Sequence, residues 1–260
     1  MRMLSFTPYH EDPNQLHVGC EPNHAYFIPF ASRETALADD RTASEQAVFL
    51  DGEWDFCYYE SLDDLLATGD GQGFAFPQRH DTIPVPSCWQ MQGLDSHQYV
   101  NIRYPIPFDP PHVPTENPCG AYRTVFSLTR EQLSGRVYLN FEGVDSFFYV
   151  WMHGTRVGYS QVSHSTSEFD VTELVHEGEN TLAVLVLKWS AATYLEDQDK
   201  LRMSGIFRDV YLLLRPACHI RDFTVRTWGS ESYGKACVQT GLLWTGGTGR
   251  ASWRLEDPDG

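Results

Sequence analysis

Short segments in which apolar and polar residues alternate run from residue 120 to residue 214, and glycine turns separate them. Residues 122–128 and 136–141 alternate with a period of two, as strands do. Residues 182–187 are apolar throughout, which predicts a strand buried on both faces. A helical period is almost absent, so the pattern predicts an all-β fold, an antiparallel jelly-roll β-sandwich.

The residues before this stretch are less regular. Residues 1–45 contain scattered prolines and no sustained period, which predicts an extended N-terminal arm. Residues 48–59 predict two strand fragments on either side of the turn dipeptide Asp51-Gly52. Residues 61–68 predict a short helix with a serine cap, and the Pro- and Gly-rich residues 74–118 predict loops and edge segments.

The C-terminal residues predict a second unit. Residues 220–227, 235–243 and 251–255 each have the composition of a strand. Three strands alone would leave apolar faces underpaired, so we expect the start of an immunoglobulin-like domain within a longer protein. The predicted division is an arm (1–45), a jelly-roll domain (46–216) and a truncated immunoglobulin-like segment (217–260).

The composition argues against several functions. The 260 residues carry a formal net charge of −16, which disfavours contact with nucleic acids and anionic membranes. No apolar run has the length of a membrane span or of a signal-peptide core. The six scattered cysteines lack the spacing of a zinc site or a redox pair. We therefore expect a cytoplasmic protein with reduced, buried thiols that binds neither nucleic acid nor membrane.

The most informative segment is YLEDQDKLRMSGIFRDV, residues 194–210, called the acidic segment below. Glu196, Asp197 and Asp199 crowd into four positions, and such carboxylates repel unless water, a cation or hydrogen-bond donors compensate them. The residues alone leave two alternatives, a solvated loop or a site for a cation or polyhydroxy ligand, and favour the solvated loop. Catalysis by this segment alone is not expected, because a glycosidase pair must flank the scissile bond at about 5–9.5 Å.

Ordered motifs surround the acidic segment. VPSCWQMQGLDSHQYVNIRYPI (85–106), PPHVPTENPCGAYRTVF (110–126), FEGVDSFFYVWMHGTRVGYSQ (141–161) and GENTLAVLVLKWS (178–190) precede it in the chain. Together with the acidic segment they resemble the family 2 β-galactosidases from about residue 48 to residue 214. The sequence departs from that family's pattern at Cys88, where Asn is usual, and at Leu201, where an aromatic residue is common.

The resemblance implies a sugar-binding jelly-roll domain that packs on a (β/α)₈ barrel outside this chain. That barrel would supply both catalytic glutamates of a retaining enzyme, and also magnesium, so no catalytic residue is expected here. Asp199 matches a residue that contacts a sodium ion and galactose hydroxyls, and Asn101 matches one that hydrogen-bonds the sugar. These side chains suit the roles, since a carboxylate binds hydroxyls or a hard cation and an amide both donates and accepts.

The expected function is therefore that of the N-terminal, sugar-binding part of a homo-oligomeric β-galactosidase that hydrolyses β-D-galactosides such as lactose. The chain alone is expected to be inactive. Two rivals remain, a free-standing carbohydrate-binding module and a structural or oligomerisation domain in which Asp199 is idle. A β-glucuronidase or β-mannosidase is disfavoured by the acidic segment. Other residues are expected to be structural: Arg202 and Arg208, pairing with Asp197 or Asp209, and the core residues Trp89, Trp151 and Trp189.

Overall fold

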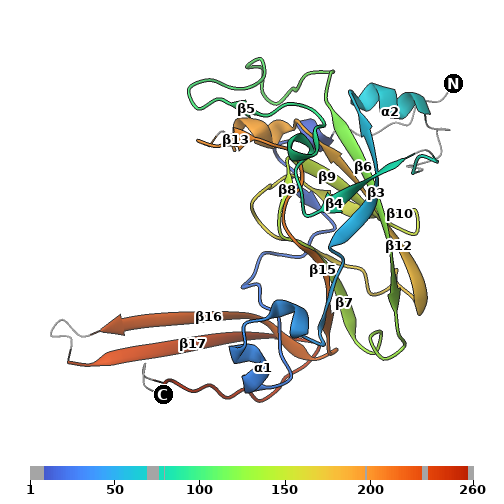
Figure 1. The fold of residues 1–260 in the computed structure, drawn as a ribbon. Coiled ribbons are helices and arrows are strands. Elements are labelled where there is room, and N and C mark those ends of the chain that lie inside the picture. Colours follow the sequence, from blue (N-terminus) through green and yellow to red (C-terminus); the bar gives the residue numbers. More distant parts are fainter. Residues whose placement is uncertain (1–8, 69–75, 79, 197, 230–233, 257–260) are drawn as a thin grey trace.

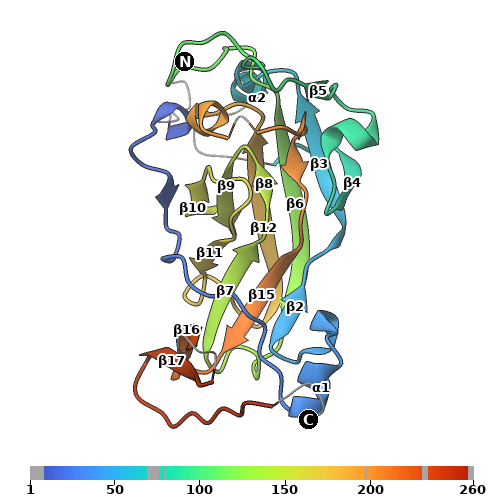
Figure 2. The same ribbon diagram turned by 90° about the vertical axis from the view of Figure 1, so that its left-hand side faces the viewer.

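The computed structural model describes residues 9–68, 76–78, 80–196, 198–229 and 234–256. Two antiparallel sheets form a sandwich (Figures 1 and 2). The first sheet has the strand order β1-β10-β9-β12-β6-β3-β4, and the second has the order β11-β7-β15-β2. The predicted antiparallel β-sandwich is confirmed.

The elements have the following bounds. The first sheet contains β1 (His17–Val18), β3 (Gly52–Tyr59), β4 (Asp81–Val85), β6 (Cys119–Leu128), β9 (Phe147–Met152), β10 (Thr155–Ser160) and β12 (Gly178–Leu187). The second contains β2 (Ala47–Phe49), β7 (Arg136–Phe141), β11 (Ser167–Asp170) and β15 (Val210–Arg215). Two-stranded ladders pair β5 (Gln98–Tyr99) with β13 (Leu201–Arg202), β8 (Val144–Asp145) with β14 (Gly205–Ile206), and β16 (His219–Gly229) with β17 (Ala236–Thr245). The helices are α1 (Arg33–Leu37) and α2 (Leu62–Thr68), and η4 (Ala191–Tyr194) is a 3-10 turn.

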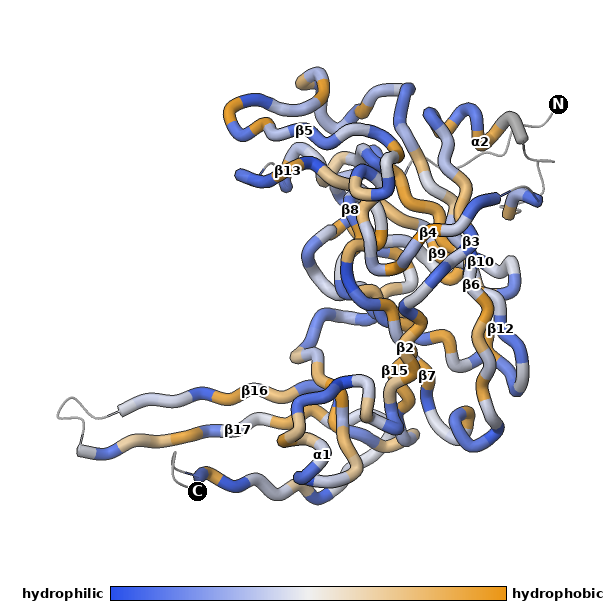
Figure 3. The backbone as a smooth tube through the Cα atoms, in the orientation of Figure 1, coloured by the Kyte–Doolittle hydropathy of each residue, from blue (hydrophilic) through white to orange (hydrophobic). Residues whose placement is uncertain are grey.

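The core lies where the apolar segments of the two sheets face each other (Figure 3). Strand β12 pairs with both β6 and β9. Val184 and Val186 point into the main core, while Leu185 and Leu187 belong to a second apolar cluster on the other face of the sheet. The expectation of a strand buried on both faces is confirmed.

Strand β7 is more buried than its alternating residues suggest. Its residues Val137 and Leu139 lie in the core, but Tyr138 and Asn140 are also buried, at 4% and 0% exposure. Ile28 of the N-terminal arm packs in the same cluster as Tyr138. Alternation in the sequence predicts which residues share a face of the strand. It does not predict that the N-terminal arm packs against the second face and helps to bury it.

Three local expectations need correction. Strands β2 and β3 flank Asp51-Gly52 as predicted, but they belong to opposite sheets, so this turn is a corner of the sandwich. Residues 251–256 form no strand, because nothing in the described chain pairs with them in a ladder. All six cysteines are free, yet only Cys119 is buried and Cys237 is exposed, so the expectation of buried thiols is wrong for most of them.

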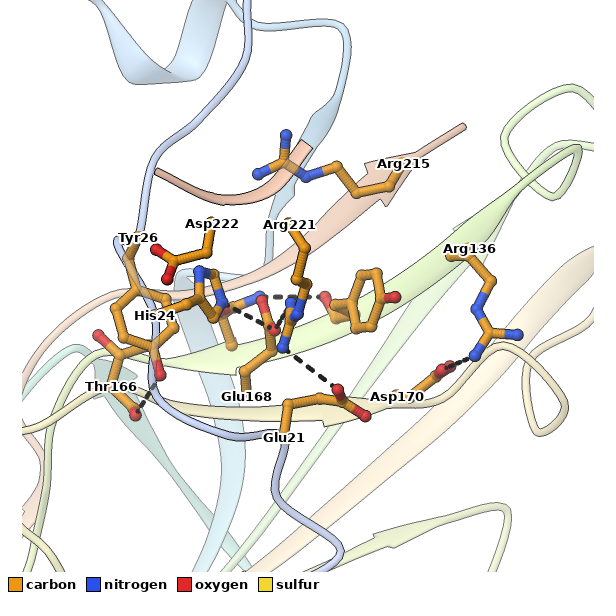
Figure 4. Close-up of polar contacts among 12 residues, drawn as sticks. Glu21, His24, Tyr26, Arg136, Thr166, Glu168, Asp170, Arg215, Arg221 and Asp222 are labelled. Carbon is orange, nitrogen blue, oxygen red and sulfur yellow. Dashed lines mark hydrogen bonds and ion pairs between the residues drawn. The ribbon is translucent and has the colours of Figure 1, made fainter. Parts of the chain in front are cut away.

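A buried carboxylate joins the arm, the second sheet and the hairpin β16–β17 (Figure 4). Glu168 on β11 has a fully buried side chain; His24 Nε2 lies 3.2 Å from its Oε1, and Arg221 on β16 donates to the same oxygen. Burial alone would raise the pKa of the Glu168 carboxyl, but these hydrogen bonds and the Arg221 charge outweigh it and hold the pKa below its ordinary value.

Candidate functional site

The ladder between β5 and β13 brings the acidic segment beside residues 98–101. Leu201 pairs with Tyr99, and Arg202 pairs with Gln98. The Tyr99 hydroxyl donates to the Asp199 carboxylate, and the side-chain amide of Asn101 donates to the same hydroxyl oxygen at 3.3 Å. The two residues singled out in the sequence, Asn101 and Asp199, therefore share one partner although they lie far apart along the chain.

These three side chains face solvent. Asn101 and Asp199 are exposed, and Tyr99 is 58% exposed. Their ladder projects from one end of the sandwich, whereas the hairpin β16–β17 projects at the other end (Figures 1 and 2). A ligand can therefore reach a carboxylate, a phenol and an amide at one edge of the fold.

Tyr99 is the site residue that the sequence reasoning missed. It lies two positions before Asn101, and residues i and i+2 of an extended strand point to the same side. That spacing was the available signal. Its importance depends on the pairing with Leu201, which only the fold determines.

We predict that Asp199→Asn lowers the pKa of the Tyr99 phenol in this chain. The hydrogen bond to the Asp199 carboxylate stabilises the protonated phenol and raises its pKa above the ordinary value, so loss of the negative charge should reverse the shift. An alkaline titration with ¹³Cζ-labelled tyrosine, followed by NMR, measures this pKa. The exposed Asp81→Asn variant is the control, and an unchanged Tyr99 titration in Asp199→Asn would contradict the contact.

Two other charged residues of the acidic segment, Glu196 and Arg202, make structural contacts. The Glu196 carboxylate accepts the backbone N–H of Ser163 at 2.9 Å. The guanidinium of Arg202 donates to the carbonyl oxygen of Glu196 at 2.7 Å. Arg202 therefore braces the segment as expected, but this contact is with the backbone of the segment. The expected partner Asp197 lies outside the described residues.

Of the two partners expected for Arg208, Asp197 lies outside the described residues, and no ion pair with Asp209 is found among the described residues. Arg208 donates to the carbonyl oxygen of His164 at 3.3 Å, whereas Asp209 pairs with Arg41 at 3.2 Å. Adjacent residues on an extended chain point to opposite sides, so an Arg208–Asp209 pair is geometrically unfavourable.

Hydrogen bonds of Trp89 and Gln90 lie close in sequence to the ladder β5–β13 that carries the candidate site. Trp89 is fully buried and its indole N–H donates to the Tyr122 hydroxyl. The Gln90 side-chain oxygen accepts the Ser204 backbone N–H at 2.9 Å, and this joins the segment after β4 to the link between β13 and β14. Trp151 and Trp189 are 5% and 8% exposed, so the expectation of three core tryptophans is confirmed.

Comparisons with known proteins agree with this architecture. Residues 48–216 match the model of the family described as "Glycosyl hydrolases family 2, sugar binding domain". The chain is 46% identical over 252 residues to a β-galactosidase of Actinobacillus pleuropneumoniae and 42% identical over 253 residues to one of Staphylococcus xylosus. Each match covers 97% of this chain but only 24% and 25%, respectively, of the relative's length.

Solved structures share the fold at low sequence identity. A β-glucuronidase of Ruminococcus gnavus superposes with a TM-score of 0.56 at 17% identity, over 78% of this chain and 34% of that one. A β-glycosidase of Bacteroides vulgatus gives 0.55 at 21% identity, over 78% of this chain and 24% of that one. Among the described residues, none of the helices is long and apolar enough to cross a membrane. The family match extends over more than half of the sequence, and this chain belongs to glycosyl hydrolase family 2, of which residues 48–216 are the sugar-binding domain.

Proposed function

We propose that this chain is the N-terminal part of a retaining β-galactosidase and lends Asn101 and Asp199 to its galactose-binding site. The observation that carries the proposal is the shared contact of both residues with the Tyr99 hydroxyl at one exposed edge. The family match and the β-galactosidases at 46% and 42% identity support the choice of substrate.

The chemistry of the three side chains suits a sugar. A carboxylate accepts hydrogen bonds from two vicinal hydroxyls, and an amide both donates and accepts. The Tyr99 hydroxyl orients both groups without blocking them from solvent. Such an arrangement would orient the hydroxyls of a terminal galactose while bond cleavage takes place on groups supplied elsewhere.

The same residues fit a sodium ion. Asp199, Tyr99 and the amide of Asn101 offer oxygen atoms, which hard cations prefer. No cluster of three or more His, Cys, Asp or Glu residues suited to a metal occurs in the described part of the chain, so Asp199 would complete a shell whose other ligands lie elsewhere. Bound there, the cation would supply a positive charge that holds sugar hydroxyls.

The remaining functions are assigned to the complete enzyme. This chain spans about a quarter of the length of its curated relatives, so we place the catalytic glutamates and the magnesium ions outside it. Apolar side chains beside the site, Ile102 at 91% and Leu201 at 44% exposure, suit contact with a further domain at this edge. We propose a cytoplasmic homo-oligomer, to which the acidic surface gives solubility.

The test is turnover of lactose and a nitrophenyl β-galactoside by the complete enzyme. We expect sodium-dependent hydrolysis in which the first-formed galactose is the β anomer, seen by NMR, and no turnover by the isolated chain. Asn101→Ala should raise KM about tenfold, as expected for loss of one sugar hydrogen bond, and the exposed Asn14→Ala variant should behave as wild type. A complete enzyme without galactoside turnover would refute the proposal.

A further inference from the structure

Asp199 lies on a short span that is anchored at both ends. On one side, the Glu196 carboxylate accepts hydrogen bonds from Ser163, and on the other, Lys200 Nζ lies 2.8 Å from Asp145 Oδ2. Among the described residues, no hydrogen bond or ion pair joins either anchor to Tyr99 or Asn101. The span can therefore hold an exposed carboxylate in a defined place without using the groups that would meet a ligand.

The anchor at Glu196 is the more specific of the two. Glu196 Oε1 accepts the Ser163 backbone N–H at 2.9 Å, and Oε2 accepts the Ser163 hydroxyl at 2.5 Å. Ser163 is fully buried, and the Glu196 backbone N–H donates to Ala192 of the buried turn η4 at 2.8 Å. The side chain and the backbone of Glu196 are thus both hydrogen-bonded to buried parts of the fold.

Arg202 connects this anchor to the ligand-facing ladder. It is only 6% exposed, and its guanidinium donates to the Glu196 carbonyl at 2.7 Å and to the Gln198 carbonyl at 3.5 Å. Arg202 belongs to β13, next to Leu201, which pairs with Tyr99. A displacement of Glu196 would therefore be transmitted both along the span and through Arg202 to the site.

Glu196 and Lys200 of the span line a cavity of about 10 Å³, which is room for one water molecule at most. The residues that line it include the charged members of both anchors, Asp145, Glu196 and Lys200, and also Lys188 and Arg202. The Glu196 side chain therefore lies in a closely packed environment of charged groups.

We propose that Glu196 is a positioning residue: its two hydrogen bonds to Ser163 hold Asp199 where it meets Tyr99 and where sugar and cation would bind. The proposal rests on the proposed function for its ligand. Glu196 itself contacts neither sugar nor cation. It acts by restricting where the Asp199 carboxylate can go.

In the complete enzyme, Glu196→Ala should raise KM for a β-galactoside and the sodium concentration at half-maximal activity by about 10-fold or more, with a smaller change in kcat. Loss of an outer partner of a ligand-binding side chain typically costs 10–100-fold in affinity or activity. Glu196→Gln retains an acceptor for the Ser163 N–H and a similar size, so it should recover most of the loss. The exposed Glu179→Ala variant on β12 is the matched control.

Two measurements on this chain do not depend on enzymatic activity. In Glu196→Ala, hydrogen exchange at the backbone amides of Gln198 and Lys200, which donate within the span, should accelerate about tenfold or more. The Tyr99 phenol should titrate closer to an ordinary tyrosine, because Asp199 no longer stays beside it. Ser163→Ala, which removes only the hydroxyl donor, should show a smaller effect of the same kind and serves if Glu196→Ala does not fold.

The outcomes separate the two proposals. If the complete enzyme does not hydrolyse galactosides, the proposed function fails, while the exchange and titration results still decide the role of Glu196. The positioning role is overturned if Glu196→Ala leaves the exchange and the Tyr99 titration unchanged. It is equally overturned if Asp199→Ala abolishes the sodium response and Glu196→Ala does not weaken it, or if Glu196→Gln is as impaired as Glu196→Ala.

Discussion

Replacement of Asp199 by alanine is expected to lower kcat/KM of the complete enzyme for β-galactosides about 100-fold or more. Under the proposed function, the substitution removes both an ionised hydrogen-bond acceptor for the sugar and a ligand of the cation. Loss of an outer partner already costs about 10–100-fold, so loss of a direct ligand should cost at least as much. The activity that remains should no longer respond to sodium. Asp199 makes its described contact with Tyr99 at the exposed edge, so the fold itself should tolerate the change.

Asp199→Asn distinguishes the two proposed roles of the carboxylate. Asparagine keeps an oxygen acceptor for sugar hydroxyls but carries no charge to attract a cation. Sodium titrations at constant ionic strength, with choline replacing sodium, should therefore show a lost sodium response in both variants and a smaller rise in KM for asparagine. Asp81→Ala, an exposed residue of the edge strand β4, is the control. Wild-type turnover and sodium response in Asp199→Ala would favour a structural domain.

The second large effect is expected on stability, from Arg221→Met. Arg221 donates to Glu168 and also lies 3.2 Å from Glu21, and its side chain is only 12% exposed (Figure 4). Methionine keeps much of the side-chain volume but leaves the buried Glu168 carboxylate without its cation. Removal of one partner of a buried ion pair costs about 3–5 kcal/mol, and chemical denaturation of this chain measures the change in unfolding free energy.

The loss of unfolding free energy in Arg221→Met should become smaller as the pH falls. The pKa of Glu168 is lowered in the folded chain, so the stability it contributes is present above the unfolded-state pKa of about 4.3 and is lost as pH falls through the folded-state value. In Arg221→Met that lowering is weakened. The difference in unfolding free energy between wild type and variant should therefore shrink as the pH falls below about 4.3.

Two further variants test whether the loss of stability comes from the ion pair between Arg221 and Glu168. Arg226→Met lies on the same strand, is exposed, and should change stability by less than about 0.5 kcal/mol. The double variant Arg221→Met with Glu168→Met should be more stable than Arg221→Met alone, because no charge is left buried. If Arg226→Met were as destabilising as Arg221→Met, the loss would come from the strand and not from the ion pair.

The candidate residues could be predicted from the sequence, but their geometry could not. Asn101 and Asp199 were identified by motifs, and the structure brings both to Tyr99. Tyr99 itself was missed because its role depends on the ladder opposite Leu201. Likewise, the three neighbouring carboxylate positions of the acidic segment gave no sign that Glu196 turns to Ser163, a residue far away in sequence.

The sequence by itself determined where most of the strands and turns of the sandwich occur, because alternation, apolar runs and turn residues are local properties of the chain. It also located the acidic segment and the motifs that indicate the family. Only the tertiary structure decided that β2 and β3 belong to opposite sheets, that the arm covers β7, and that one tyrosine joins Asn101 to Asp199. Strand partners and buried ion pairs arise from contacts between distant residues, and a local pattern carries no information on which distant residues will meet.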